Sequence, residues 1–482
     1  MVHFKSRQEH DLQVAKCQEM LQQRKALKPL TLKYTQSNTL RSGEYKHNAD
    51  TIDLSAFNAI LAIDTLKCTA TVEPRVTIRE LTEATLKYGF IPLIVPEFET
   101  ITVGGAINGA ALESTSHKYG QFNDTCIEYE LLLGNGTLLK ANQEENSDLF
   151  YGMSGSYGTL AILTLVTLKL TQAKKGVRLK LTKFSSSQAL IREMQLSFNN
   201  AKRPDIIEGG LLAKNWAVLI TGSYTDTFST NRLFSQKHSW DPWYYQQITE
   251  STAKADQIEV DMPLTDYLFR FDRGAFWMGR YLLSWPSMVQ IALKWRLPEV
   301  ISKISETASK LTPRTHPSLL FRTLFGSVLS SKRLYEVWHK VPKELSEQLF
   351  FIQDFYTPLD KVEEAFETFN EKTGIFPMWL CPILGTSTPQ ILSPHFSENQ
   401  KNFINIGLYG VPKKGKPVPE LTAECEEILH KMGGRKMLYS QTYYSKKLFA
   451  EIYDLPRYEE LCKKYFSYNV FLPIYNKIIN RS

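Results

Sequence analysis

The stretch TVGGAINGAALESTSHKYG, residues 102–120, decides the fold class of this 482-residue chain. It opens a longer window, residues 102–160, that holds nine of the chain's 25 glycines. Glycine at that density is typical of backbone packed closely against another group, because residues without side chains leave their main-chain amides unobstructed. Two interpretations follow. Either the amides form a concave binding site for a dinucleotide, or the glycines serve only tight turns in a β-rich region.

Two common phosphate-binding motifs do not fit this stretch. Gly104 and Gly109 have the spacing of a P-loop, but Ala110 and Ala111 stand where a lysine and a hydroxyl residue reach phosphate and magnesium. A Rossmann fingerprint needs three glycines between a strand and its helix, and an acidic residue about twenty positions later. No segment supplies all of these features, so a Rossmann domain is not expected.

The length and composition predict two ordinary folded domains, because a single hydrophobic core stops growing near about 250–300 residues. The chain has 43% hydrophobic and 22% charged residues. Its net charge of +7 is spread thinly, so we expect no nucleic-acid partner. The six cysteines lack the paired spacing of a metal site or a redox dithiol, and no metal is expected.

The chain lacks the usual membrane signals. Its N-terminus has no apolar core typical of a signal peptide, and no stretch reaches the roughly 18 apolar residues of a spanning helix. We therefore expect a cytoplasmic protein. An aromatic-rich segment between residues 234 and 296 has two interpretations: a peripheral membrane contact that admits a lipid, or a second-domain core edged by surface charge. Its aromatic and basic residues include Trp240, Trp243, Trp277, Trp285, Trp295, Arg270, Arg273, Arg280, Lys294 and Arg296.

Local patterns around the glycine-rich window predict a mixed α+β structure. Thr77 with Glu80 three residues later is a capping box, which predicts the start of a helix. The pair Asn135-Gly136 lies between two apolar runs and predicts a tight hairpin. Residues 158–170 are apolar at nearly every position, which predicts a strand buried on both faces.

From about residue 176 the pattern changes to strand-like runs interleaved with helical ones, which predicts an antiparallel sheet with helices on one side. The strand-like runs are 177–184, 216–224, 350–356, 376–383 and 403–410. The helical runs are 187–198 and 359–374.

Several motifs, taken in order, resemble the FAD-binding half of the vanillyl-alcohol-oxidase superfamily. They are TVGG (102–105), SHKYG (116–120), GNG (134–136), ENSDLFY (145–151) and GSYGTL (155–160). Later stretches, FPMWLCPI, INIGLYG and MLYSQTYYSKKLF, are similar to the delta-24 sterol reductase family in particular. The likeness runs from about residue 10 almost to the C-terminus. It implies an α+β protein that contains a two-subdomain PCMH-type FAD-binding domain.

The resemblance also implies a domain order. An N-terminal helix at residues 1–25 precedes the FAD-binding domain at 26–175. An α+β substrate or cap domain with an antiparallel sheet follows at 176–425, and a C-terminal segment, 426–482, returns to the flavin site.

The same resemblance implies where FAD binds. The loop at 35–43 would meet the pyrophosphate, residues 102–108 would run beside the flavin, and 158–162 would close over the adenine or ribose. The loop lacks the Gly-Gly-His arrangement through which many relatives attach flavin, and His47 is displaced, so we expect non-covalent FAD. The residues implied to bind it are Ser37, Asn38, Thr39, Arg41, Thr102, Val103, Gly104, Gly105, Asn108, Ser114, Ser116, His117, Gly120, Gly158, Thr159, Ile162 and Tyr439.

The activity implied by the resemblance is reduction of a sterol or isoprenoid side-chain double bond, with NADPH as the electron donor. Such an addition needs a proton donor and a dry, apolar pocket. The candidate catalytic residues are His117, Glu113 and Tyr443, with Tyr444 as a further candidate acid and Gln441 as a further active-site residue. For each of them, a purely structural role is the alternative interpretation.

Two other functions stay open at this point. The first is an FAD-dependent oxidase or dehydrogenase of an alcohol, such as a sugar alcohol or a lipid-linked sugar. Sugar-oxidising relatives commonly carry a lysine near the flavin, whereas Lys446 and Lys447 come later here, which argues against such a substrate. The second is a non-catalytic lipid-binding protein, and the glycine-rich window and Arg41 argue against it.

Overall fold

The computed structural model describes residues 3–24, 28–33, 38–41, 43–279, 319, 322–323, 326, 329–340, 347–413 and 416–479. The chain divides into two compact units. Unit 1 comprises Met1–Ala173, Leu384–Lys401 and Met437–Ser482, and unit 2 comprises Lys174–Ile383 and Asn402–Lys436. Unit 1 is therefore assembled from three separate stretches of sequence.

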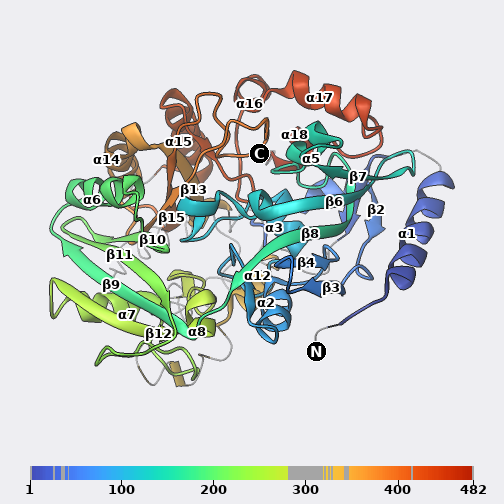
Figure 1. The fold of residues 1–482 in the computed structure, drawn as a ribbon. Helices are drawn as coiled ribbons and strands as arrows, with labels where there is room; N and C mark the ends of the chain where they lie inside the picture. Colours follow the sequence, from blue (N-terminus) through green and yellow to red (C-terminus); the bar gives the residue numbers. More distant parts are fainter. Residues whose placement is uncertain are drawn as a thin grey trace. The chain divides into compact units, whose positions relative to one another are not determined.

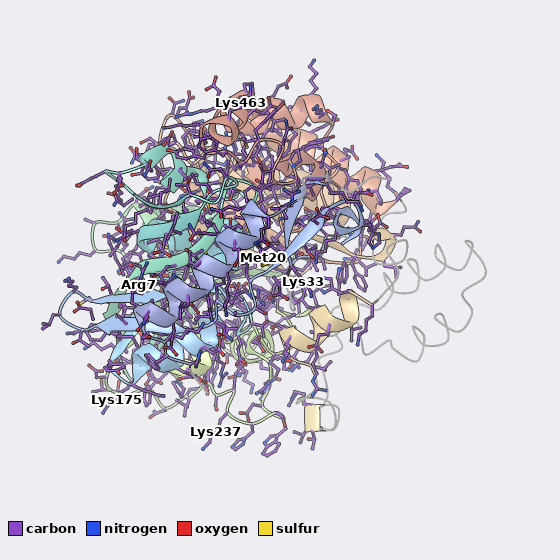
Figure 2. The ribbon with its side chains drawn as sticks, turned by 90° about the vertical axis from the view of Figure 1, so that its right-hand side faces the viewer. Arg7, Met20, Lys33, Lys175, Lys237 and Lys463 are labelled. Atoms are coloured by element: carbon purple, nitrogen blue, oxygen red, sulfur yellow. The ribbon has the colours of Figure 1, made fainter. Side chains whose placement is uncertain are left out.

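Unit 1 begins with helix α1 (Arg7–Gln22), which starts at a capping box between Ser6 and Glu9. Its outer face is exposed, and Figure 2 shows Arg7 near the beginning of the helix and Met20 near its end. The inner face packs on the parallel strands β1 (Leu30–Lys33) and β2 (Asp50–Asp53). The buried residues of α1 in this cluster are Val14, Cys17 and Leu21.

The main sheet of unit 1 has six strands, and all of its pairings are antiparallel. They are β3 (Ile60–Asp64), β4 (Thr69–Val72), β5 (Phe90–Pro92), β6 (Cys126–Leu132), β7 (Leu138–Asn142) and β8 (Ile162–Gln172). The order is β3-β4-β8-β6-β7, and β5 also pairs with β8. The central β8 is buried along most of its length, which confirms the prediction of a strand covered on both faces.

Short helices surround this sheet (Figure 1). They are η1 (Glu44–Asn48), α2 (Ile78–Leu86), α3 (Val103–Asn108), α4 (Ser116–Tyr119), η2 (Phe122–Thr125), α5 (Ser147–Gly152), α16 (Lys446–Tyr453), α17 (Leu455–Lys464) and α18 (Ile474–Ile478). Two local predictions are confirmed. Thr77 and Glu80 form the capping box of α2, and Asn135-Gly136 turns the chain between β6 and β7, with Gly136 at φ 84°.

Unit 2 is built on an antiparallel sheet of eight strands, which confirms the predicted sheet. Its strands are β9 (Gly176–Phe184), β10 (Ile206–Ala213), β11 (Trp216–Thr225), β12 (Gln257–Pro263), β13 (Phe351–Pro358), β14 (Met378–Ile383), β15 (Phe403–Gly410) and β16 (Arg435–Lys436). Their order is β12-β9-β11-β10-β14-β15-β13-β16. The described helices are α6 (Ser187–Asn199), α7 (Tyr244–Thr252), α8 (Leu264–Leu268), α12 (Ser331–Trp338), η4 (Leu359–Lys361), α14 (Val362–Thr373) and α15 (Val418–Lys431).

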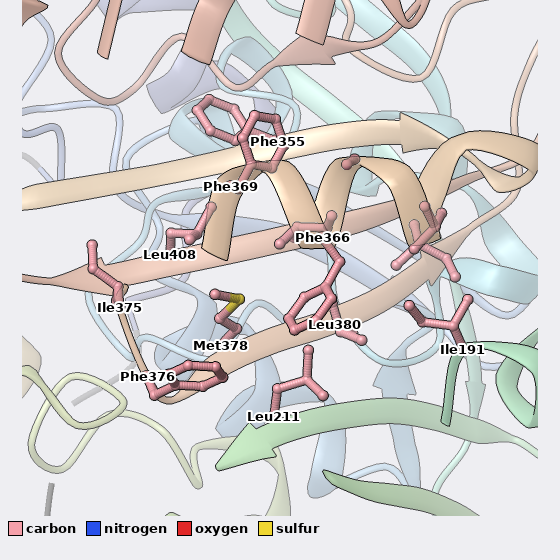
Figure 3. Packing of buried hydrophobic residues seen from close by; sticks show 14 of the residues in the cluster. Ile191, Leu211, Phe355, Phe366, Phe369, Ile375, Phe376, Met378, Leu380 and Leu408 are labelled. Carbon is pink, nitrogen blue, oxygen red and sulfur yellow. The ribbon is translucent and has the colours of Figure 1, made fainter. Parts of the chain in front are cut away.

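One face of this sheet carries the core of unit 2. Helices α6, α14 and α15 lie against it (Figure 1) and contribute to one buried apolar cluster with β10, β13, β14 and β15. Figure 3 shows Phe366 and Phe369 of α14 above Met378 and Leu380 of β14. The hydrophobic repeat of α14 therefore buries its apolar side on the sheet, as its sequence pattern predicts.

The opposite face of β14 and β15 is covered by aromatic residues. Trp277 contacts Tyr409 at a ring-centroid distance of 5.7 Å, and Phe271 contacts Trp379 at 6.0 Å. Arg270 is buried and pairs with Glu208 at 2.8 Å. These residues match the core interpretation of the aromatic-rich segment, whereas Arg280, Trp285, Lys294, Trp295 and Arg296 lie outside the described residues. Within the described part of the chain, no helix is both long enough and apolar enough to cross a membrane.

Candidate cofactor site

Helix α3 of unit 1 begins at Thr102, whose hydroxyl accepts a hydrogen bond from Gly105 N at 3.1 Å. The amides of Val103 and Gly104 donate to carbonyls of the turn at residues 74–76. The glycine spacing predicts open amides at these positions, and this prediction is wrong. The turn lies close in space and satisfies these amides, as buried backbone donors require.

The glycines of α3 leave one edge of the helix, at Thr102, Gly104 and Gly105, with little side-chain cover, and we call it the bare edge. A Cβ at Gly104 would lie 2.7 Å from the Cβ of Pro74, so the close packing there requires glycine. Gly105 is exposed, and Thr102, Gly104 and Gly109 are half-buried. A flat ligand can therefore lie along this edge and meet backbone without a side chain in its path.

Asn108, at the end of α3, ties the helix to the turn at Ser156–Gly158. Its Nδ2 donates to Gly104 O at 2.9 Å, and its Oδ1 accepts from Ser156 Oγ at 2.8 Å and from Gly158 N at 2.9 Å. Gly158 has φ 70° and Tyr157 has φ 52°. The side chain of Asn108 is thus used within the protein, where it holds the turn that presents Tyr157.

Arg41 is buried beside this turn, with its guanidinium 4.4 Å above the centre of the Tyr157 ring. One terminal nitrogen donates to Lys477 O at 3.4 Å, a long hydrogen bond. Its Nε is buried with no hydrogen-bond partner among the described residues. A buried guanidinium donor normally has an acceptor, so this atom indicates an absent group.

Two lysines share the surroundings of Arg41. Lys477 is buried, and its Nζ donates to Tyr157 O at 2.6 Å. Burial and the charges of Arg41 and Lys46 lower the pKa of Lys477 to about 7. Burial and Arg41 also lower the pKa of Lys46. We call Arg41, Lys46 and Lys477 the cation cluster.

The cation cluster has no acidic partner among the described residues, since none of its members forms an ion pair there. Buried charges are normally paired with an opposite charge. A cluster of three cations with an unsatisfied guanidinium Nε therefore fits an anionic ligand. The diphosphate of FAD has the charge and the acceptor oxygens that such a cluster requires.

The segment from Glu113 to His117 is buried and held by its own hydrogen bonds. Glu113 Oε1 accepts from Ser114 N at 2.7 Å, and Ser116 Oγ accepts from Glu113 N at 2.9 Å. His117 Nδ1 lies 2.9 Å from Ser114 O. Because a carbonyl only accepts, Nδ1 carries the proton, and Nε2 of the neutral ring carries the lone pair. These contacts fix the orientation of the His117 ring.

A second stretch of unit 1, residues 384–401, fastens this segment from outside, and we call it the 384–401 strap. Leu384 N donates to Ser116 O at 3.0 Å. Further along, His395 Nε2 lies 2.8 Å from Asp124 Oδ2. Burial raises the pKa of Asp124, but His395 and hydrogen bonds from Gln121 and Gln390 outweigh burial and hold that pKa below its ordinary value.

A polar cavity of about 250 Å³ lies between the 384–401 strap and residues 119–126 and 143–154. Its lining includes Asp124, His395 and Ser154, whose hydroxyl is buried and has no partner among the residues that the structure describes. Sites for drug-sized ligands usually measure roughly 300–1,000 Å³. The cavity is therefore too small to hold a sterol.

The C-terminal part of unit 1 reaches the predicted pyrophosphate loop. Leu40 N donates to Tyr439 O at 3.0 Å, which ties this segment to the loop residues before Arg41. Tyr439 and Tyr443 are half-buried, and Tyr444 is buried with its carbonyl bound to the Tyr475 hydroxyl at 3.1 Å. Gln441 is also buried in this segment.

The structure does not bring every predicted residue to this region. Ser37 lies outside the described residues. Thr159 accepts from the Tyr458 hydroxyl at 2.7 Å and donates to Ser156 O, and Ile162 belongs to the apolar cluster under α1. Asn38 exchanges hydrogen bonds with Thr100, and Thr39 follows it in the same loop. Gly120 has φ 76° and packs against the Asp124 carboxylate, where a Cβ would collide with it.

Sequence analysis missed Lys46, Tyr157, Asp124, His395 and Lys477. Tyr157 lies inside the motif GSYGTL, so the family resemblance could have identified it as a candidate site residue. The positive charges of Lys46 and Lys477 were visible, but nothing in the local pattern distinguishes them from surface lysines. His395 lies 271 positions from its partner Asp124, and no sequence pattern links the two.

Comparison with known proteins defines the class of this protein. The family described as FAD binding domain matches residues 13–142, which include α1 from residue 13 onward, the loop before Arg41 and all of α3. Together with the α+β fold and the relatives described next, this match defines an FAD-dependent oxidoreductase with a PCMH-type FAD-binding domain.

Relatives that match nearly the whole chain narrow this class. The chain is 30% identical over 444 residues to the delta(24)-sterol reductases of Macaca fascicularis and Homo sapiens, covering 91% of this chain and 80% of each relative. It is 27% identical over 472 residues to the delta(24)-sterol reductase of Arabidopsis thaliana, covering 91% of this chain and 78% of that relative. The chain belongs to the delta(24)-sterol reductase family, as its motifs predict.

Proposed function

We propose that this chain reduces the side-chain double bond of a sterol or a related isoprenoid, with FAD as cofactor and NADPH as electron donor. The observation that carries the proposal is the 30% identity to delta(24)-sterol reductases over 91% of the chain, because it extends through both units. The FAD binding domain match alone covers only residues 13–142 and supports the cofactor.

The proposed assignment of FAD uses groups of unit 1. The cation cluster would bind the diphosphate, with Arg41 Nε as one donor. The bare edge of α3 at Thr102, Gly104 and Gly105 would lie along the cofactor, which is held without a covalent bond. When bound, FAD supplies the hydride-transfer chemistry. We further propose that unit 2 is the substrate domain.

The proton in this reaction would come from this chain. In the proposed addition, carbon 24 of the substrate accepts a proton, and carbon 25 accepts a hydride, so the double bond becomes a single bond. His117 is our preferred donor, since its ring is buried and oriented by Ser114 O at 2.9 Å. With Nδ1 already protonated, His117 gives up a proton from Nε2 only as the imidazolium. Glu113 and Tyr443 are the other candidate donors.

The surroundings of His117 are buried, which supports a reaction site from which water is excluded. The residues at 113–117 are all buried, and the 384–401 strap binds the Ser116 carbonyl through Leu384 N. Exclusion of water strengthens electrostatic interactions and protects a positive charge that develops on carbon. The strap would therefore hold the proton donor in place without contacting the substrate itself.

Product analysis tests this proposal. The purified, FAD-loaded protein is incubated with NADPH and desmosterol, and the sterol is then analysed by mass spectrometry. We expect a product heavier than desmosterol by the added proton and hydride, formed only when both FAD and NADPH are present, and lost in His117→Gln. Flavin that is bleached by a sugar alcohol but not by NADPH would instead identify an alcohol oxidase. A protein that binds no FAD would contradict the whole assignment.

A further inference from the structure

The C-terminal helix α18 places a lysine where the proposed diphosphate would lie. Lys477 is fully inside unit 1, with only 4% of its surface exposed. Its Nζ has one hydrogen-bond partner among the described residues, Tyr157 O at 2.6 Å, and its own carbonyl accepts from Arg41. Residues 13–142 match the FAD binding domain family, so Lys477 lies far outside that match.

The groups that face the Lys477 ammonium are cationic or aromatic. Arg41 comes from the loop before η1, and Lys46 comes from η1 itself. The Tyr45 ring lies 5.8 Å from Lys477 Nζ, and Tyr157 contributes its carbonyl. Within the described residues, no carboxylate lies within ion-pair distance of Lys477. A charged ammonium is therefore opposed by burial and by two neighbouring cations.

We propose that Lys477 is neutral in the cofactor-free protein above neutral pH and takes up one proton when FAD binds. The inference rests on the proposed FAD site. A neutral amine still donates to Tyr157 O, so the free protein keeps that hydrogen bond. A diphosphate brings a negative charge on each phosphate, which favours the ammonium. The proton comes from solvent, and no bond other than the N–H bond forms.

The pKa of about 7 for Lys477 sets the pH range of the effect. Below that pKa the lysine already carries its proton, so FAD binding takes up none through this residue. Above it, most molecules hold a neutral amine, and binding takes up close to one proton per site. FAD affinity therefore falls as the pH rises above about 7, until the raised pKa of the complex is reached.

Titration calorimetry tests this directly on the unaltered apo-protein. FAD is titrated in two buffers with different ionisation enthalpies, at about pH 8 and at about pH 6, and the difference in observed heat gives the protons taken up. We expect close to one proton at the higher pH and close to none at the lower pH.

Three variants assign the proton to its residue. Lys477→Arg keeps the charge but cannot lose it, so it should bind FAD with affinity near that of the unaltered protein and take up no proton. Lys477→Met should weaken FAD binding by about tenfold to a hundredfold, the loss of one charge-assisted hydrogen bond. Lys463→Met removes an exposed lysine of α17 and should change neither quantity.

The outcomes separate this inference from the proposed function. FAD binding by the unaltered protein without proton uptake at the higher pH would overturn the inference and leave the FAD site standing. Uptake that persists in Lys477→Arg would assign the proton to another residue and overturn it as well. If the unaltered protein binds no FAD, both proposals fail.

Discussion

Unit 1 contains two groups of buried and half-buried charges, and they differ in whether the charges are paired. His10 of α1 lies between Glu73 and Glu130, with each ring nitrogen 2.8 Å from a carboxylate oxygen. Lys5 also pairs with Glu73, and Thr164 donates to Glu130. Every one of these buried charges has an opposite charge beside it. The cation cluster of Arg41, Lys46 and Lys477 has none among the described residues.

The difference indicates which buried charges serve the fold and which serve a ligand. The His10 network attaches α1 to the main sheet, because Glu130 belongs to β6 and Glu73 follows β4. Its positive and negative charges are paired within the protein, so the network can stabilise the fold without a ligand. In the cation cluster, like charges face one another and destabilise the empty site. Loss of the Lys477 proton eases this repulsion in part, but among the described residues no carboxylate pairs with the cluster, so an anion from outside the chain is needed to neutralise it.

Removal of the paired histidine should give the largest effect on stability. His10→Ala leaves Glu73 and Glu130 facing each other in a buried site, which should cost about 3–5 kcal/mol of unfolding free energy. Denaturant unfolding of the FAD-free protein measures this. A loss below about 1 kcal/mol would mean that water or the remaining partners satisfy the two carboxylates, and the paired network would not be structural.

Removal of one unpaired cation should weaken FAD binding and leave the stability of the FAD-free protein nearly unchanged. Arg41→Met keeps the apolar packing on Tyr157 but removes one like charge, so we expect FAD affinity to fall about tenfold to a hundredfold. The unfolding free energy of the FAD-free protein should change by less than about 1 kcal/mol, because lost contacts and relieved repulsion offset each other. Fluorescence titration and denaturant unfolding of one preparation measure both. If Arg41→Met strongly destabilised the protein and left the FAD affinity unchanged, Arg41 would serve the fold and not the ligand.

Within the His10 network, His10 and Glu130 should respond to pH in opposite directions. Burial lowers the pKa of His10, but its hydrogen bonds to Glu130 and Glu73 outweigh burial and raise that pKa above its ordinary value. This contribution is present at low pH and is lost as pH rises through the raised pKa. The pKa of Glu130 is lowered to about 2, so its contribution persists above the ordinary range and is lost only as pH falls toward about 2.

The stability difference between the unaltered protein and His10→Ala should therefore shrink as the pH is raised above neutral. Unfolding curves at a series of pH values measure it. A difference that grows with pH would show that His10 is neutral in the folded protein.

The smallest effect is expected at an exposed pair of the same unit. Lys464 and Asp148 form an ion pair whose side chains remain 59% and 36% exposed. Lys464→Ala should change the unfolding free energy by less than about 1 kcal/mol, since solvent and salt screen such a pair. This variant also serves as the control for His10→Ala, and a larger loss would mean that exposure is a poor guide to the importance of a charge here.

Local sequence patterns predicted those parts of the fold that depend on near neighbours. The capping box at Thr77 and Glu80 and the turn at Asn135-Gly136 are complete within a few residues, so propensity alone indicates them. The strands of unit 2 were predicted for the same reason, because their apolar residues lie close together in the sequence. The open amides at Val103 and Gly104 were wrongly predicted, because their carbonyl partners at residues 74–76 are supplied by the tertiary fold.

The candidate site depends even more on contacts between residues far apart in the sequence, which local patterns do not reveal. Arg41 follows from its loop and from the family resemblance. Its contact with Lys477 spans 436 positions, and the strap residue His395 meets Asp124 across 271 positions. Side chains brought together over such distances share no periodicity or spacing. Their grouping follows only from the path of the whole chain.

The central claim is that the cation cluster binds the diphosphate of the cofactor, and comparison of FAD with riboflavin tests it most directly. Riboflavin has the same ring system but no phosphate. Fluorescence titration of the apo-protein should show FAD bound at least about a hundredfold more tightly than riboflavin, and Arg41→Met should narrow this gap by about tenfold to a hundredfold. Equal affinities for the two flavins, or a gap that Arg41→Met leaves intact, would contradict the account.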